Sequence, residues 1–64
     1  VMSTLTELAQ HIAQLYPLTD KSAGRRYRIV NQLAGLTELE DTSGRPRYIA
    51  SRQLRDHSRW EMAS

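Results

Sequence analysis

The sequence contains no cysteine and no phenylalanine, and only three glycines and two prolines. Without cysteine there is no disulfide framework and no thiolate metal site, and two histidines alone do not make a zinc site. Apolar runs are too short to span a membrane, and the N-terminus lacks the apolar block of a secretory signal. These absences predict a soluble cytoplasmic protein with no metal, cofactor or membrane partner.

The length of 64 residues allows one domain, and we assign residues 1–64 to it. A core this small supplies only a few kcal/mol of net stability unless a partner shares the burial. The nine basic and seven acidic residues give a net charge of +2, which alone does not indicate a polyanion partner. Their distribution is more informative, since every basic residue lies between Lys21 and Arg59 and eight of the nine are arginine.

The first twenty residues predict one amphipathic helix. Thr4 and Glu7 make a capping box, so we expect the helix to begin at Ser3 or Thr4. Pro17 ends it, and Leu18 is the expected core anchor of the turn. Apolar residues recur at helical spacing along one side, and we expect this side to be buried: Leu5, Leu8, Ala9, Ile12, Leu15 and Tyr16.

A second helix is predicted from an N-cap at Thr19 or Asp20 to about Ala34, with Gly35 as its stop. On a helical wheel its polar and mostly basic side chains fall within a narrow arc: Lys21, Arg25, Arg28 and Gln32. The opposite arc is apolar: Ala23, Tyr27, Val30, Leu33 and Ala34. One face is therefore expected to be basic and exposed, and the other to be core.

Beyond the second helix the pattern changes to a hairpin. Leu36 and Leu39 are expected to face inward, residues 41–44 to form the turn, and residues 45–50 to return with Tyr48 in the core. Pro46 cannot donate to a ladder, which favours a two-stranded edge ribbon.

Ser51 can cap a short final helix over residues 52–62, and Trp60 is either a lid on the core or an interface anchor. Together these elements predict an α+β fold, a small winged helix-turn-helix with two helices, a two-stranded wing and a short C-terminal helix. In such a unit the second helix enters the major groove of DNA and the hairpin touches the flanking backbone. The expected DNA contacts are Lys21, Ser22, Arg25, Arg28, Asn31 and Gln32 in the helix, with Ser43, Arg45 and Arg47 in the wing.

The run from Arg25 to Tyr48 resembles the recognition helix and wing of transcription regulators of the MarR and ArsR type. The segment Gly44-Arg45-Pro46-Arg47-Tyr48 is also similar to the wing of MerR-type and phage excisionase domains, in which a helix follows the wing. The resemblance covers residues 4–56. It implies a sequence-specific double-stranded DNA-binding protein, a transcriptional regulator or excisionase-like architectural factor, two copies of which pair on DNA.

A rival hypothesis is a small protein-interaction module, an antirepressor or host-factor inhibitor, that binds a protein partner. An enzyme is not expected. His11 and His57 have no nucleophile and orienting group in a recognisable arrangement. Glu38 and Glu40 lie on one face of an expected exposed strand, which is more typical of a solvated surface than of acid–base chemistry.

Overall fold

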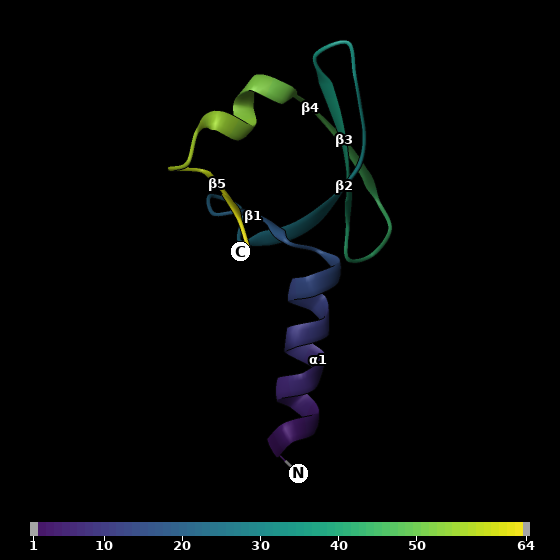
Figure 1. Cartoon of the computed structure of the whole chain (residues 1–64), viewed down its shortest axis with the longest axis vertical. Coiled ribbons are helices and arrows are strands. Elements are labelled where there is room, and N and C mark those ends of the chain that lie inside the picture. Colours follow the sequence, from purple (N-terminus) through teal and green to yellow (C-terminus); the bar gives the residue numbers. More distant parts are fainter. Residues whose placement is uncertain (1, 64) are drawn as a thin grey trace.

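The computed structural model describes residues 2–63, which form one helix followed by a five-stranded antiparallel sheet (Figure 1). The elements in chain order are α1 (Met2–Leu15), β1 (Leu18–Asp20), β2 (Arg25–Leu33), β3 (Leu36–Asp41), β4 (Pro46–Ala50), the 3-10 helix η1 (Ser51–Arg55) and β5 (Trp60–Met62). The strand order across the sheet is β4-β3-β2-β1-β5. The first four strands therefore form a meander, and β5 returns to pair with β1.

The core lies on the concave side of the curved sheet, where each strand supplies one buried apolar side chain (Figure 1). These residues are Leu18 of β1, Tyr27 of β2, Leu39 of β3, Ile49 of β4 and Trp60 of β5. Leu54 of η1 packs against them from the open side. Burial of Leu18, Tyr27 and Leu39 confirms the expectation for these three positions.

Helix α1 ends at Leu15, two residues before Pro17, and its predicted extent is confirmed to within two residues. The expectation that its apolar side is buried is wrong. The helix projects from the sheet along the 45 Å long axis of the molecule, and no strand packs along it (Figure 1). Leu5, Leu8 and Leu15 are 70%, 56% and 65% exposed.

The second predicted helix does not exist, because residues 21–24 form a turn and residues 25–33 form β2. The segment is rich in strand-favouring side chains such as Tyr27, Ile29 and Val30. The predicted N-cap chemistry is used in the turn, where Asp20 Oδ1 accepts hydrogen bonds from the backbone N–H of Ser22 at 3.1 Å and of Ala23 at 3.4 Å. A carboxylate that accepts neighbouring N–H groups stabilises a turn as readily as a helix start.

The Ala34-Gly35 pair, predicted to end a helix, is the two-residue turn of the β2–β3 hairpin. Leu33 pairs with Leu36, and both turn residues have positive φ angles, 53° for Ala34 and 78° for Gly35. Two positive φ angles in a two-residue loop define the twisted hairpin turn that usually carries Asn-Gly. Alanine at the first position hid this turn from sequence reasoning.

The predicted hairpin over residues 36–50 is confirmed as β3 and β4, and Pro46 lies on an edge strand as expected. The two-stranded ribbon is wrong, since β3 also pairs with β2 inside a five-stranded sheet. Leu36 and Tyr48 lie on the exposed convex face rather than in the core.

The predicted final helix is also wrong. Only the short η1 is helical, and the chain then turns at Asp56 and enters β5. Trp60 is the first residue of β5 and packs in the core beside Tyr27, with the two ring centroids 6.0 Å apart. With one α-helix and five strands among residues 2–63, the winged helix-turn-helix prediction is wrong and the fold is a different small α+β architecture.

Candidate functional site

The arginines expected on a single DNA-binding surface lie on opposite faces of the sheet. Arg47 pairs in register with Leu39, whose side chain is fully buried, so Arg47 points to the concave side. Arg28 pairs with Glu40, one residue along from Leu39, and therefore points to the convex side. The register thus places Arg28 of the predicted helix and Arg47 of the predicted wing on opposite faces of the sheet.

Arg47 is held by the most buried carboxylate of the described chain, that of Asp20, which is 0% exposed. Arg47 Nη1 donates to Asp20 Oδ2 at 2.9 Å and to the hydroxyl of Tyr27 at 3.0 Å. Arg59 Nε approaches the other carboxylate oxygen at 3.4 Å, and the Ser22 hydroxyl donates to it at 2.8 Å. A buried charge requires such partners, so this cluster is part of the core of the fold.

Two aromatic rings complete the cluster. The guanidinium of Arg47 lies 5.4 Å from the ring centre of Tyr27 and 5.3 Å from that of Trp60, while Arg59 lies 5.4 Å from Trp60. Burial alone would raise the pKa of Asp20, but hydrogen bonds from Ser22, Arg47 and Arg59 outweigh it and hold that pKa far below its ordinary value. The carboxylate therefore stays ionised and paired, which suits a structural ion cluster and not proton transfer.

Three turns share one chemistry that accounts for Ser22 and Ser43. In the Asp-x-Ser segments at residues 20–22, 41–43 and 56–58, the aspartate Oδ1 accepts from both the backbone N–H and the hydroxyl of the serine. Asp41 also accepts from the backbone N–H of Arg45 at 2.9 Å, and hydrogen bonds from Arg45 and Ser43 lower its pKa. The hydroxyls predicted to contact phosphate are thus donors within their own turns.

Other predicted contacts are also engaged within the chain. Lys21 Nζ donates to the carbonyl of His57 at 3.0 Å and lies 3.7 Å from Glu61. Arg28 forms an ion pair with Glu40 at 2.7 Å, and Gln32 donates to the hydroxyl of Thr37 at 3.2 Å.

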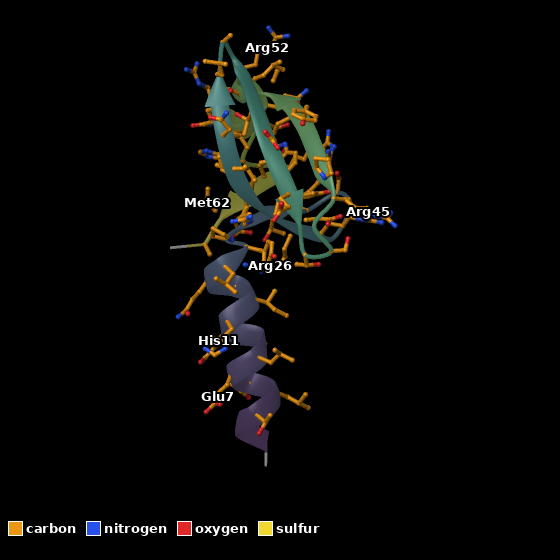
Figure 2. The ribbon with its side chains drawn as sticks, turned by 90° about the vertical axis from the view of Figure 1, so that its right-hand side faces the viewer. Glu7, His11, Arg26, Arg45, Arg52 and Met62 are labelled. Carbon is orange, nitrogen blue, oxygen red and sulfur yellow. The ribbon has the colours of Figure 1, made fainter. Side chains whose placement is uncertain are left out.

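Asn31 Oδ1 accepts the backbone N–H of Gln32 at 2.9 Å, so this predicted contact is also partly satisfied locally. Arg25 and Arg45 are exposed, and their side chains make no hydrogen bond or ion pair with residues 2–63. Figure 2 shows Arg45 at the end of the sheet nearest the helix and Arg52 at the far end. Of the predicted contacts, only these two arginines have fully unpaired side chains at the helix end of the sheet.

One side of α1 carries large apolar side chains that are exposed to solvent. We define the α1 stripe as Leu5, Leu8, Ile12 and Leu15, which are all exposed. The polar residues Glu7 and His11 project from another side of the helix (Figure 2). The stripe therefore forms a continuous apolar seam that the described chain leaves open to water.

A second apolar surface lies on the convex face of the sheet at the β2–β3 turn, away from α1. We define it as the outer patch, formed by Leu33, Leu36 and Tyr48, which are 75%, 54% and 63% exposed. Together with Asn31, Ala34 and Glu38 these side chains line a shallow hollow of about 270 Å³. The hollow is mostly apolar, and Glu38 is the one carboxylate in its lining.

Within residues 2–63 no group of three or more histidine, cysteine, aspartate or glutamate side chains is arranged to hold a metal ion. The same residues contain no helix long and apolar enough to cross a membrane. His11 and His57 are both exposed and lie on α1 and in the turn before β5.

The comparisons with known proteins add no relative: no protein-family model, no curated protein and no solved structure matches the chain.

Both apolar surfaces escaped sequence reasoning, which assigned Leu5, Leu8, Leu36 and Tyr48 to the core. One available signal was the spacing of the large aliphatic residues in the α1 stripe, whose intervals of three, four and three are those of a two-helix seam.

Proposed function

We propose that the protein is a small protein-interaction module that uses α1 as its binding arm. The observation that carries the proposal is the exposure of the whole α1 stripe on a helix that no described strand covers. An isolated helix of 14 residues is only marginally stable in water, since most helical stability in proteins comes from burying an apolar face. The helix therefore gains its stability from a protein surface that covers the stripe.

The charge of α1 supports an apolar partner surface. Glu7 is the only carboxylate in the helix, which has no lysine or arginine, and it lies well away from the stripe. A contiguous apolar seam with uncharged edges is typical of a surface that meets another protein. The outer patch offers a second apolar contact at the opposite end of the molecule (Figure 1).

Photo-crosslinking tests this proposal. A photoreactive residue at position 8, inside the stripe, is compared with the same residue at position 10, which is on the opposite side of α1. We expect covalent protein adducts in the source cells from position 8 and few from position 10. Equal adduct yields from the two positions, or no protein adduct from position 8 in a folded chain, would refute the proposal.

Duplex DNA binding is a second candidate, supported by the unpaired guanidinium groups of Arg25 and Arg45 at one end of the sheet. With no helix available at residues 21–32, this binding would rely on phosphate contacts. Two such contacts predict that the logarithm of affinity falls with the logarithm of salt concentration with a slope of about −1.8. Affinity for duplex DNA that is unchanged in the double variant Arg25→Ala/Arg45→Ala excludes this candidate.

A further inference from the structure

We propose that the occupant of the α1 stripe is α1 of a second copy of this chain, packed antiparallel in a two-fold symmetric dimer. This inference rests on the proposed function, because it identifies the partner of the same helix. It goes further in fixing the partner, the direction of pairing and the residues that meet.

The spacing of the stripe indicates a helix as its partner. Its residues follow one another at intervals of three, four and three, which is the repeat of positions a and d in a coiled coil. Such a seam is narrow and matches one facing helix better than a broad sheet. The positions that flank it carry no carboxylate, lysine or arginine, and they are Thr4, Ala9, His11 and Tyr16.

The order of residues along the stripe makes it complementary to itself in the antiparallel direction. A two-fold axis at the level of residue 10 places Leu5 opposite Leu15 of the second copy and Leu8 opposite Ile12 of the second copy. Each contact then joins two large aliphatic side chains, and each is made twice. Glu7 lies off the seam, so pairing two copies brings no like charges together at the contact.

The shape of the molecule beside α1 favours antiparallel over parallel pairing of the two helices. Ile12 lines one side of an open hollow whose other side is formed by Gly24, Arg25 and Arg26 of the β1–β2 region and by residues 41–43 of the β3–β4 turn. The end of the sheet therefore overhangs the stripe near the C-terminal end of α1. Parallel pairing would bring two such overhangs into the same space, whereas antiparallel pairing places the first turn of each helix beside the hollow of the other copy.

The contact is short, since 14 residues span about 21 Å and supply two a and d repeats. Interfaces at the small end of the range are weak, so we expect a dissociation constant on the order of micromolar. Sedimentation of the full chain from about 1 μM to 1 mM should then show a monomer converting to a dimer. Leu8→Gln should raise the dissociation constant about tenfold or more, and Gln10→Ala, on the far side of the helix, should leave it unchanged.

The absence of native cysteine allows a direct test of orientation. Leu5→Cys and Leu15→Cys variants are mixed, one of them carrying a mass tag, and then oxidised. Antiparallel pairing should enrich the mixed disulfide between positions 5 and 15, while parallel pairing should give the two like-with-like disulfides. Trp60 fluorescence confirms that the sheet of each variant is folded, because Trp60 is buried in the core.

The outcomes are distinct. Concentration-dependent dimers that are lost in Leu8→Gln, together with the mixed disulfide, support the inference. A chain that stays monomeric to 1 mM (about the top of the tested range), a dimer that Leu8→Gln does not weaken, or predominant like-with-like disulfides would overturn it. The crosslinking experiment at positions 8 and 10 separately tests the proposed function: adducts of stripe residues to a different protein, from a chain that stays monomeric in sedimentation, would preserve that function while excluding self-pairing.

Discussion

Asp20 of β1 and Arg47 of β4 meet on the concave side of the sheet, with Oδ2 and Nη1 2.9 Å apart, although 27 residues separate them in the chain. The pair joins strands that are not neighbours, since β2 and β3 lie between them in the sheet. This contact holds the Arg47 side chain, which is 32% exposed, against the buried Asp20 carboxylate and beside the rings of Tyr27 and Trp60.

Replacing Arg47 with alanine should destabilise the fold strongly. Breaking a buried ion pair leaves an undercompensated charge, which costs about 3–5 kcal/mol, although Arg59 and Ser22 remain near Asp20 and place the expected loss near the lower end. The measurement is the free energy of unfolding in urea. The matched control is Arg45→Ala, two residues away and without an ion pair, which should change stability by less than about 0.5 kcal/mol.

Stability should fall in acid because the pKa values of Asp20 and Asp41 are both lowered in the folded protein. A lowered folded-state pKa contributes stability that is present above the unfolded-state value of about 3.9 and is lost as the pH falls toward the folded-state value. The urea midpoint should therefore be steady from about pH 7 to pH 5 and then fall from about pH 4 to pH 2. A midpoint that does not change below pH 4, or rises, would contradict the ion cluster. The Asp20→Asn variant should show a shallower fall.

A leucine-to-alanine substitution should destabilise the protein much more on the inner face of the sheet than on the outer face. Leu39→Ala removes a fully buried side chain and should cost about 2–5 kcal/mol, enough to unfold much of so small a protein. Leu33→Ala, on the outer patch, should change stability by less than about 0.5 kcal/mol. Urea unfolding of the two variants checks this, and similar losses would mean that the two faces of the sheet have been assigned wrongly.

The β2–β3 turn should be open to stabilisation. Ala34 has a φ of 53°, a left-handed conformation that alanine adopts at a cost and asparagine tolerates better. Ala34→Asn should therefore raise the free energy of unfolding by about 0.5–1 kcal/mol. Gly35→Ala should lower it by about 1 kcal/mol, even though a Cβ there would meet no other atom, since the strain is in the backbone alone. A lower melting temperature for Ala34→Asn, or a higher one for Gly35→Ala, would refute the turn assignment.

Sequence reasoning succeeded where the signal was local. The boundary of α1 at Pro17 depends on the steric effect of proline on its neighbour, and the β3–β4 hairpin depends on a glycine-containing turn between two short strands. Leu18 was placed in the core as the apolar anchor of the turn after Pro17, and Leu39 was placed there from the strand-like alternation of its segment. Such features act over a few residues and do not require knowledge of the rest of the fold.

The error over residues 21–34 arose because the segment satisfies two periods at once. Its arginines recur at helical spacing, yet Tyr27 and Ile29 alternate with Arg26 and Arg28 as in a strand. The segment forms strand β2 and not a helix because it pairs with β1 on one side and β3 on the other. Local propensity does not reveal this pairing. The Asp-x-Ser turns at residues 20–22 and 56–58 were local evidence for strands that was missed.

The amino-acid sequence by itself determined that the chain has no cysteine for disulfides. It also determined the N-terminal amphipathic helix, the hairpin over residues 36–50 and the apolar residues available for a core. Only the tertiary structure decided which apolar residues are covered and which arginines are free. Burial and ion pairing depend on groups brought together from distant strands, as Asp20 and Arg47 are. For the same reason the stripe of α1, which looks like a core face in the sequence, lies open because the curved sheet fills its own interior with one side chain from each strand.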